Sequence, residues 1–142
     1  MAEEFKAELT IQSSIDQLEK VRDFVSEAAQ AFGFEECEGY KIVMAVDEAC
    51  SNIIRHGYNK KPDQKLHIVI QTDGNRFTVI VNDSGKSYDI CNHPLPDMET
   101  YLAAKRSGGL GIKLIRSLVD EIQYEHSNGE NKLVLTKRLP SR

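Results

Sequence analysis

Apolar and polar residues alternate over several short stretches of this chain, and alternation with a period of two is typical of strands with one buried face. The pattern predicts strands over residues 5–12, 66–70, 77–81, 122–124 and 133–139. The sequence T-D-G-N lies between the second and third of these strands, and S-N-G-E-N lies between the last two. Both are typical turn sequences, so each pair of strands is expected to form a hairpin.

Three other segments carry apolar residues at intervals of three and four, which is the period of a helix. In the first segment, Ser14 followed by Gln17 resembles a capping box, and Gly33 follows the last apolar residue. This predicts a helix that begins near Ser14 and ends before Gly33. A second helix is expected over residues 36–56 and a third over residues 110–119.

The segment over residues 84–107 has little periodicity apart from a short helical pattern around residues 98–104. A loop of this length in a compact domain is usually functional or mobile, and we expect it to act as a lid. The order of elements is strand, helix, helix, two strands, loop, helix, two strands. It predicts one domain over residues 1–142 with an α+β fold: a two-layer α/β sandwich in which helices cover one face of a mostly antiparallel, mixed sheet.

Composition and charge argue against several classes of protein. The formal net charge is −4 without a block of like charges, so a nucleic-acid-binding surface is not expected. The acidic start M-A-E-E-F-K does not resemble a signal peptide, and no apolar run approaches the roughly 18 residues of a membrane helix. We therefore expect a soluble, cytoplasmic protein. The three cysteines are widely spaced, which predicts reduced and mostly buried thiols.

Three polar residues of the second predicted helix are spaced four apart: Glu48, Asn52 and His56. Four residues make about one helical turn, so these side chains project from nearly the same face. The amide oxygen of Asn52 suits Mg²⁺, which takes its other ligands from waters and phosphates, and Glu48 could be the general base for an attacking hydroxyl. A solvated helix face is the alternative for this pair, and His56 is expected to be a structural residue at the helix end.

Asp83 ends the third predicted strand and is followed by Ser84 and Gly85. An ordinary turn is one interpretation of this sequence. In the other, the Asp83 carboxylate accepts a hydrogen bond from the exocyclic amine of adenine, and Gly85 lets the base approach the backbone. Guanine presents a carbonyl oxygen at that position and would be rejected.

The last predicted helix begins with three glycines in four positions: Gly108, Gly109, Leu110 and Gly111. The segment matches neither the Walker loop nor the Rossmann fingerprint. Its backbone N–H groups could still converge on a phosphate at the helix N-terminus, and a flexible turn is the alternative. Arg55 and Arg106 could also reach the phosphates, or they could be exposed solubilising charges.

Together and in this order, these stretches resemble the Bergerat-fold ATPases, the superfamily of gyrase, MutL and histidine kinases. The first stretch is E-A-C-S-N-I-I-R-H, the second is D-S-G and the third is G-G-L-G. Within the superfamily, E-A-x-x-N-x-x-x-H-G-Y and G-L-G-I-x-L-I-R-S-L-V-D-E are most similar to the anti-sigma-factor serine kinases. Many members of the superfamily have a second glycine where Lys86 and Ser87 follow Gly85 here. The anti-sigma kinase branch commonly lacks it, so ATP binding is still expected.

The resemblance implies an anti-sigma factor that is also an ATP-dependent protein-serine/threonine kinase. Such a protein sequesters a sigma factor, phosphorylates a serine on an anti-anti-sigma antagonist of the STAS type, and is expected to form a homodimer. Carried over residue by residue, Glu48 is the base, Asn52 is the Mg²⁺ ligand and Asp83 reads the adenine of ATP. Gly85 and residues 108–111 line the nucleotide.

Two alternatives stay open at this point. One is a partner-binding module of the same fold that sequesters a sigma factor without catalysis, and the other is a stand-alone ATPase. The presence of both Glu48 and Asn52 favours catalysis, because a protein that only binds a partner needs neither residue.

Overall fold

The fold is built from one sheet and a layer of helices, as a computed structural model shows. The model describes residues 4–57, 64–85 and 111–140. Its elements in chain order are β1 (Phe5–Gln12), the 3-10 helix η1 (Ile15–Gln17), α1 (Leu18–Phe32), α2 (Glu36–Asn52), the π-helical turn η2 (Ile53–Gly57), β2 (Lys65–Asp73), β3 (Arg76–Asp83), α4 (Gly111–Leu118), β4 (Glu121–Ser127) and β5 (Glu130–Arg138).

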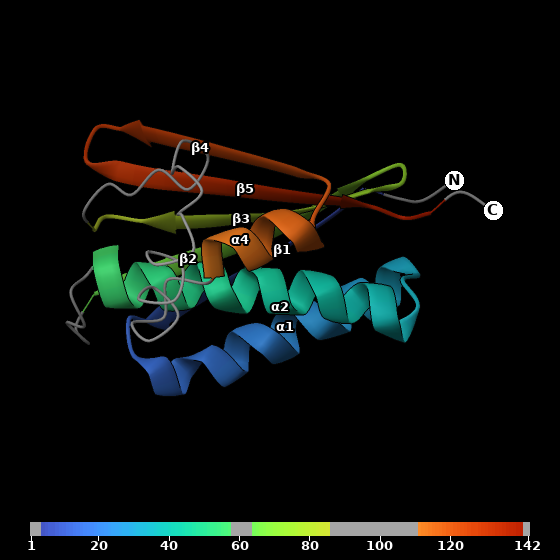
Figure 1. The fold of residues 1–142 in the computed structure, drawn as a ribbon, viewed down its shortest axis with the longest axis horizontal. Coiled ribbons are helices and arrows are strands. Elements are labelled where there is room, and N and C mark those ends of the chain that lie inside the picture. The colour runs from blue at the N-terminus through green and yellow to red at the C-terminus, as the bar shows by residue number, and fades with distance from the viewer. Residues whose placement is uncertain (1–3, 58–63, 86–110, 141–142) are drawn as a thin grey trace.

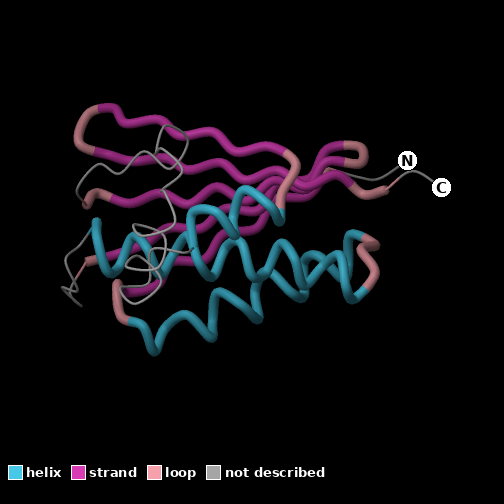
Figure 2. The backbone as a smooth tube through the Cα atoms, in the orientation of Figure 1, coloured by secondary structure: helices cyan, strands magenta, loops and turns pink. Residues whose placement is uncertain are grey.

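The five strands lie in the order β1-β2-β3-β5-β4, and each neighbouring pair is antiparallel. The helices α1, α2 and α4 lie together on one face of this sheet, while no described helix covers the other face (Figure 1). The tube in Figure 2 shows the same two layers. The predicted two-layer α+β fold is therefore confirmed, with a described sheet that is antiparallel throughout.

Register between the strands decides which side chains reach the core. Ile68 pairs with Val81 and Ile70 with Val79, and all four are fully buried. Side chains alternate between the two faces of a strand. The even-numbered positions of β2 and the odd-numbered positions of β3 therefore both point to the helix layer. The helices contribute the other side of the core through buried apolar residues: Leu18, Val21, Val25, Ala29, Ile42, Val46 and Ile115.

Three elements begin or end at the same end of the molecule. Figure 1 shows the last turn of α2, the carboxyl end of β3 and the start of β5 toward its left side, while α4 begins further in, in front of α2. Chain direction explains this, because α2 and β3 run toward that end and β5 runs away from it. Asn52 ends α2 and Asp83 ends β3, so the fold brings two predicted site segments to one end.

Several predicted boundaries need correction. The capping box at Ser14 is not formed: Ser14 Oγ hydrogen-bonds the side chain of Asp16, which competes for the hydroxyl, and α1 begins at Leu18 after η1. Gly33 does end α1, in the left-handed region with φ 113°. The second predicted helix is α2 continued by η2, and the strand predicted over residues 66–70 is longer, as β2.

Some other predictions meet a different outcome. Cys50 is buried, but Cys37 is exposed on the first turn of α2, so the expectation of mostly buried thiols is wrong for Cys37. Cys91, the predicted lid and the short helix around residues 98–104 lie outside the described residues. Within the described parts of the chain, no helix has the length and apolar character needed to cross a membrane.

Two glycines give opposite stability predictions for the helix layer. Gly33 has a positive φ, and Gly39 lies inside α2, where an added Cβ would make ordinary contacts of 3.6 Å with Ala29 and Phe34. We expect Gly33→Ala to lower the free energy of unfolding by about 1–2 kcal/mol, and Gly39→Ala to raise it by about 0.5–1 kcal/mol. Urea unfolding followed by circular dichroism measures both changes. A stabilised Gly33→Ala protein would contradict the left-handed cap.

Candidate active site

Asn52 is the last residue of α2 and is only 2% exposed. Its Nδ2 atom is buried and has no hydrogen-bond partner among the described residues. A buried amide donor left unpaired costs about 1–3 kcal/mol, so this is a poor position for an amide that serves packing alone. The solvated-face alternative is therefore wrong for Asn52.

Glu48 lies one turn before Asn52 on α2 and is half-buried. Burial raises the pKa of its carboxyl group, and the neighbouring charge of Asp47 raises it further, while the positive charge of Arg55 opposes the shift. Asp47 itself forms an ion pair of 2.9 Å with Arg22 of α1, which joins the two helices. Glu48 is thus a carboxylate that takes up a proton more readily than an exposed glutamate does.

The other predicted residues of η2 are only partly described. Arg55 is half-buried, and its charge acts on Glu48 as stated above. The backbone of His56 lies in η2. Its side chain lies outside the described part of the structure, so the predicted structural role of His56 stays a prediction.

Asp83 ends β3 and is 7% exposed. It lies in phase with Val79 and Val81, so its side chain projects toward the helices. Burial chiefly raises the pKa of the Cys50 thiol on α2, and the negative charges of Asp47 and Asp83 add to the shift. The carboxyl end of β3, which carries Asp83, and the last turn of α2, which carries Asn52, lie at the same end of the molecule (Figure 1).

Two N–H groups hold the carboxylate of Asp83. Its Oδ1 atom accepts hydrogen bonds from the backbone N of Gly85 and from Nδ2 of Asn131, both at 2.9 Å. Burial raises the pKa of Asp83, while these two hydrogen bonds and the charge of His126 oppose the shift. The ordinary-turn interpretation holds for the Gly85 contact, but the buried partner on β5 shows that Asp83 does more than close a turn.

Asn131 is a residue of this region that the sequence interpretation missed. It pairs with Asp83 between β3 and β5 and is 2% exposed. Besides Asp83, its Nδ2 donates to the carbonyl oxygen of Gly85 at 3.0 Å. Its Oδ1 accepts from the Tyr124 hydroxyl at 2.7 Å and lies 2.6 Å from Nδ1 of His126. A signal existed in the sequence, because Asn131 is in phase with the buried side of β5.

The glycine segment is described only in part. Gly111 begins α4, which lies on the same face of the sheet as α2 (Figure 1). Arg106, Gly108, Gly109 and Leu110 lie outside the described residues, so their predicted contacts with phosphates stay predictions.

The predicted metal site depends on Asn52. Among the described residues there is no cluster of three or more histidine, cysteine, aspartate or glutamate side chains that could hold a metal ion. A cation in this region would therefore need oxygen ligands from elsewhere, and Mg²⁺ commonly takes them from substrate phosphates and waters. The buried, incompletely paired amide of Asn52 fits that role, because the group can turn its oxygen toward a ligand.

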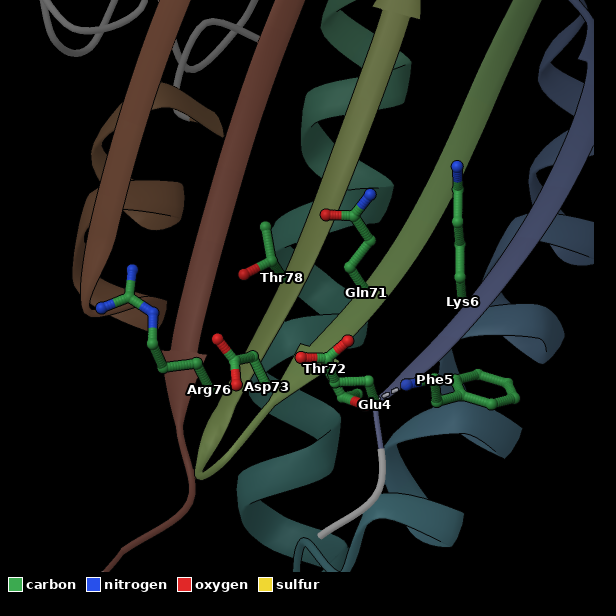
Figure 3. A pocket seen from close by; sticks show the side chains of 8 residues that line it. All are labelled: Glu4, Phe5, Lys6, Gln71, Thr72, Asp73, Arg76 and Thr78. Carbon is green, nitrogen blue, oxygen red and sulfur yellow. Dashed lines mark hydrogen bonds between the residues drawn. The ribbon is translucent and has the colours of Figure 1, made fainter.

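A separate hollow of about 560 Å³ lies on the open face of the sheet. Figure 3 shows that it is lined by polar and charged side chains of β1, β2 and β3, with Phe5 at its rim. Two of its lining residues, Asp73 and Arg76, lie on either side of the β2–β3 turn. Since Asp83 is at the other end of β3, the hollow is at the end of the sheet opposite to Asp83. None of the predicted site residues lines this hollow, so we do not connect it with the candidate site.

Comparison with known proteins decides the family. The family described as histidine kinase-like ATPase domain matches residues 11–137. The chain is 32% identical over 141 residues to a serine-protein kinase RsbW of Bacillus thuringiensis, covering 94% of this chain and 86% of the relative, and the same values hold for a Bacillus cereus RsbW. The chain belongs to the histidine kinase-like ATPase domain family.

A solved structure supports the same fold. The RsbU and RsbW domains of Rv1364c from Mycobacterium tuberculosis align with a TM-score of 0.69 and 20% sequence identity, over 97% of this chain and 34% of that chain. The comparisons confirm the predicted family, and with it the prediction of an ATP-dependent kinase.

The two buried asparagines should differ sharply in what they contribute to stability. Asn52 has an unpaired donor, whereas all four hydrogen-bonding positions of the Asn131 amide are used. Leucine has nearly the same shape as asparagine. We expect Asn52→Leu to raise the free energy of unfolding of the nucleotide-free protein by about 1 kcal/mol, and Asn131→Leu to lower it by about 3 kcal/mol. Urea unfolding without nucleotide measures both, and a more stable Asn131→Leu protein would contradict the network.

Proposed function

We propose that this protein is an ATP-dependent protein-serine kinase and anti-sigma factor, which sequesters a sigma factor and phosphorylates a serine on an anti-anti-sigma protein of the STAS type. The proposal rests on family membership and on relatives named serine-protein kinase over most of this chain. The observation that carries it is that the last turn of α2, with Asn52, and the carboxyl end of β3, with Asp83, lie at the same end of the molecule (Figure 1).

Base recognition is assigned to Asp83. Its Oδ1 is occupied by the two N–H donors from Gly85 and Asn131. The other carboxylate oxygen then accepts a hydrogen bond from the exocyclic amine of adenine. Because a carboxylate accepts but does not donate, the site prefers adenine to a base with a carbonyl oxygen at that position.

Proton transfer is assigned to Glu48. The incoming serine hydroxyl has to lose its proton as the new bond to the γ-phosphorus forms and the bond to the leaving ADP oxygen breaks. A half-buried carboxylate with a raised pKa is a better acceptor for that proton than an exposed one. Asn52 is the residue that would hold Mg²⁺, and the ion when bound neutralises charge on the phosphates.

The glycine segment and the arginines complete the proposal. Backbone N–H groups at residues 108–111 bind phosphate oxygens at the start of α4, and Arg55 and Arg106 supply positive charge near the phosphates. We further propose a single domain with the lid over residues 84–107, a cytoplasmic location and a homodimer.

One assay separates this function from its alternatives. The protein is incubated with ATP labelled at the γ-phosphate and with purified candidate antagonist proteins. Transfer of label to a serine supports the kinase, and release of free phosphate supports a stand-alone ATPase. If neither occurs, the result supports a sigma-sequestering binding module without catalysis. Co-purification with a sigma factor tests the anti-sigma activity independently.

Substitution of Glu48 should separate binding from catalysis. We expect Glu48→Gln to bind ATP with an affinity within about threefold of the original and to slow phosphoryl transfer by roughly 10²- to 10⁴-fold, the usual contribution of a general base. Isothermal titration with ATP and single-turnover transfer measure the two effects. An equal loss of ATP affinity would show that Glu48 acts in binding.

The pH profile gives the same assignment a second readout. Because burial raises the pKa of Glu48, the base becomes protonated and inactive at a higher pH than an ordinary glutamate would. The transfer rate at saturating ATP should therefore fall on the acid side through an inflection above 4.5, the unperturbed value, and this inflection should be absent in Glu48→Gln.

Substitution of Asp83 by asparagine should reverse the preferred base. The donors from Gly85 and Asn131 keep an oxygen at the Oδ1 position, so the new NH₂ group replaces the oxygen that faces the base. Two donors then meet at the adenine amine, and we expect the Kd for ATP to rise at least about tenfold. Titration with ATP measures this, with Asp73→Asn at the opposite end of the sheet as the control. Unchanged affinity for ATP in Asp83→Asn would exclude Asp83 as the adenine reader.

A further inference from the structure

The side-chain amide of Asn131 has a fixed orientation. Its nitrogen faces the carbonyl oxygen of Gly85 at 3.0 Å, and a carbonyl oxygen can only accept. The amide oxygen must therefore be on the other side, toward Tyr124 and His126. Since that oxygen can only accept, the hydroxyl of Tyr124 donates to it and Nδ1 of His126 carries a hydrogen. The orientation follows from the partners of both ends of the amide.

This fixed amide in turn orients Asp83. Both hydrogens of Nδ2 are used, one on Gly85 and one on Oδ1 of Asp83. With the backbone N–H of Gly85 also on Oδ1, two donors hold one carboxylate oxygen in place and oppose the effect of burial, which raises the pKa of Asp83. The second carboxylate oxygen of Asp83 is thereby held in one orientation, and in the ionised form it presents only an acceptor to a ligand.

We propose that Asn131 is a positioning residue that sets the base specificity of the nucleotide site, selecting a 6-aminopurine over a 6-oxopurine through Asp83. The inference rests on the proposed function, in which Asp83 reads the base. Tyr124 and His126 act one step further away, because they keep the amide from turning over. The sequence motifs that indicate a nucleotide site include none of these three residues, so the assignment comes from the strand register and the hydrogen bonds of Asn131.

A loss of the Asn131 donor has a specific consequence. A buried carboxyl group that loses a hydrogen bond is more easily protonated and is free to rotate. It can then donate to the carbonyl oxygen of a 6-oxopurine, and its hydrogen bond to a 6-aminopurine weakens. A role in stability alone would instead weaken both classes of purine nucleotide to the same extent.

The test compares ATP with ITP, which carries a carbonyl oxygen in place of the 6-amino group. The Kd of each nucleotide is measured for the full chain by competition with a fluorescent ATP analogue. In Asn131→Ala we expect the Kd for ATP to rise about tenfold or more, as for a lost hydrogen bond to a charged group, while the Kd for ITP changes less than threefold.

Three further variants make the result specific. Asn131→Thr keeps one hydroxyl donor on the strand and should recover most of the ATP preference. Tyr124→Phe removes only the hydroxyl that holds the Asn131 oxygen, and should lower the ratio of the two Kd values by about threefold. Asn82→Ala is the matched control, because Asn82 directly precedes Asp83 on β3 and projects from the opposite, open face. It should leave the ratio unchanged.

Each outcome has a distinct meaning. If Asn131→Ala folds and the ratio of the Kd values for ATP and ITP is unchanged, the inference is overturned while the proposed function stands. Equal weakening of the binding of both nucleotides is such a result. If Asn131→Ala fails to fold, Tyr124→Phe decides, and an unchanged ratio in that variant overturns the inference. If the unsubstituted protein binds neither ATP nor ITP, the proposed function has failed and the inference fails with it.

Discussion

The antiparallel pairing of β3 with β5 is the constraint on which the candidate site depends. Val79 pairs with Leu135 and Val81 with Leu133, and all four are buried under the helices. A slip of one residue would turn one strand's apolar side chains to the open face, so packing fixes the register strongly. The same register places Asn131 opposite Asp83 at the end of the ladder. Apolar packing along the strands thus sets the geometry of a polar contact.

Helix α2 carries the second half of the site at a cost in stability. Its last turn is buried against the sheet, so Asn52 is removed from water while one of its donors has no described partner. Such a group is tolerated because the core along the rest of α2, at Ile42, Val46 and Ala49, is fully apolar and closely packed. The asymmetry between a satisfied amide at Asn131 and an unsatisfied one at Asn52 fits the two roles proposed for them, positioning for Asn131 and ligand binding for Asn52.

The sequence predicts well what depends on local pattern. The strands, the helix that ends at Gly33 and the two-layer fold follow from periodicity and turn chemistry, and the spacing of Glu48 and Asn52 follows from one helical turn. It predicts less well what depends on register between distant strands. Asn131 is 48 positions from Asp83, and without the β3–β5 register the S-N-G-E-N segment is read as a turn. His126 is not predicted as a partner of Asn131 for the same reason, because the two side chains meet only through the β4–β5 pairing.

The helix boundaries show a related limit. Ser14 has the residue type and spacing of a capping box, but its hydroxyl is taken by the side chain of Asp16 two positions later. The backbone N–H of Gln17 donates to the Ser14 carbonyl oxygen instead. Which of these local hydrogen bonds forms is decided by backbone geometry, which the pattern of residue types does not contain. The π-helical turn after Asn52 also cannot be predicted from the spacing of apolar residues, because a single turn is too short to change that spacing.

The proposed roles of Asp83 and Glu48 follow from how each carboxylate is held. Burial raises the pKa of both groups. At Asp83, two N–H donors oppose that shift and fix one carboxylate oxygen in place. At Glu48 the charge of Asp47 adds to the shift, and the charge of Arg55 opposes it. A carboxylate with a fixed orientation suits recognition, because its free oxygen meets a ligand in one geometry. A carboxylate with a raised pKa suits proton transfer, so the two proposed roles follow from environment rather than from residue type.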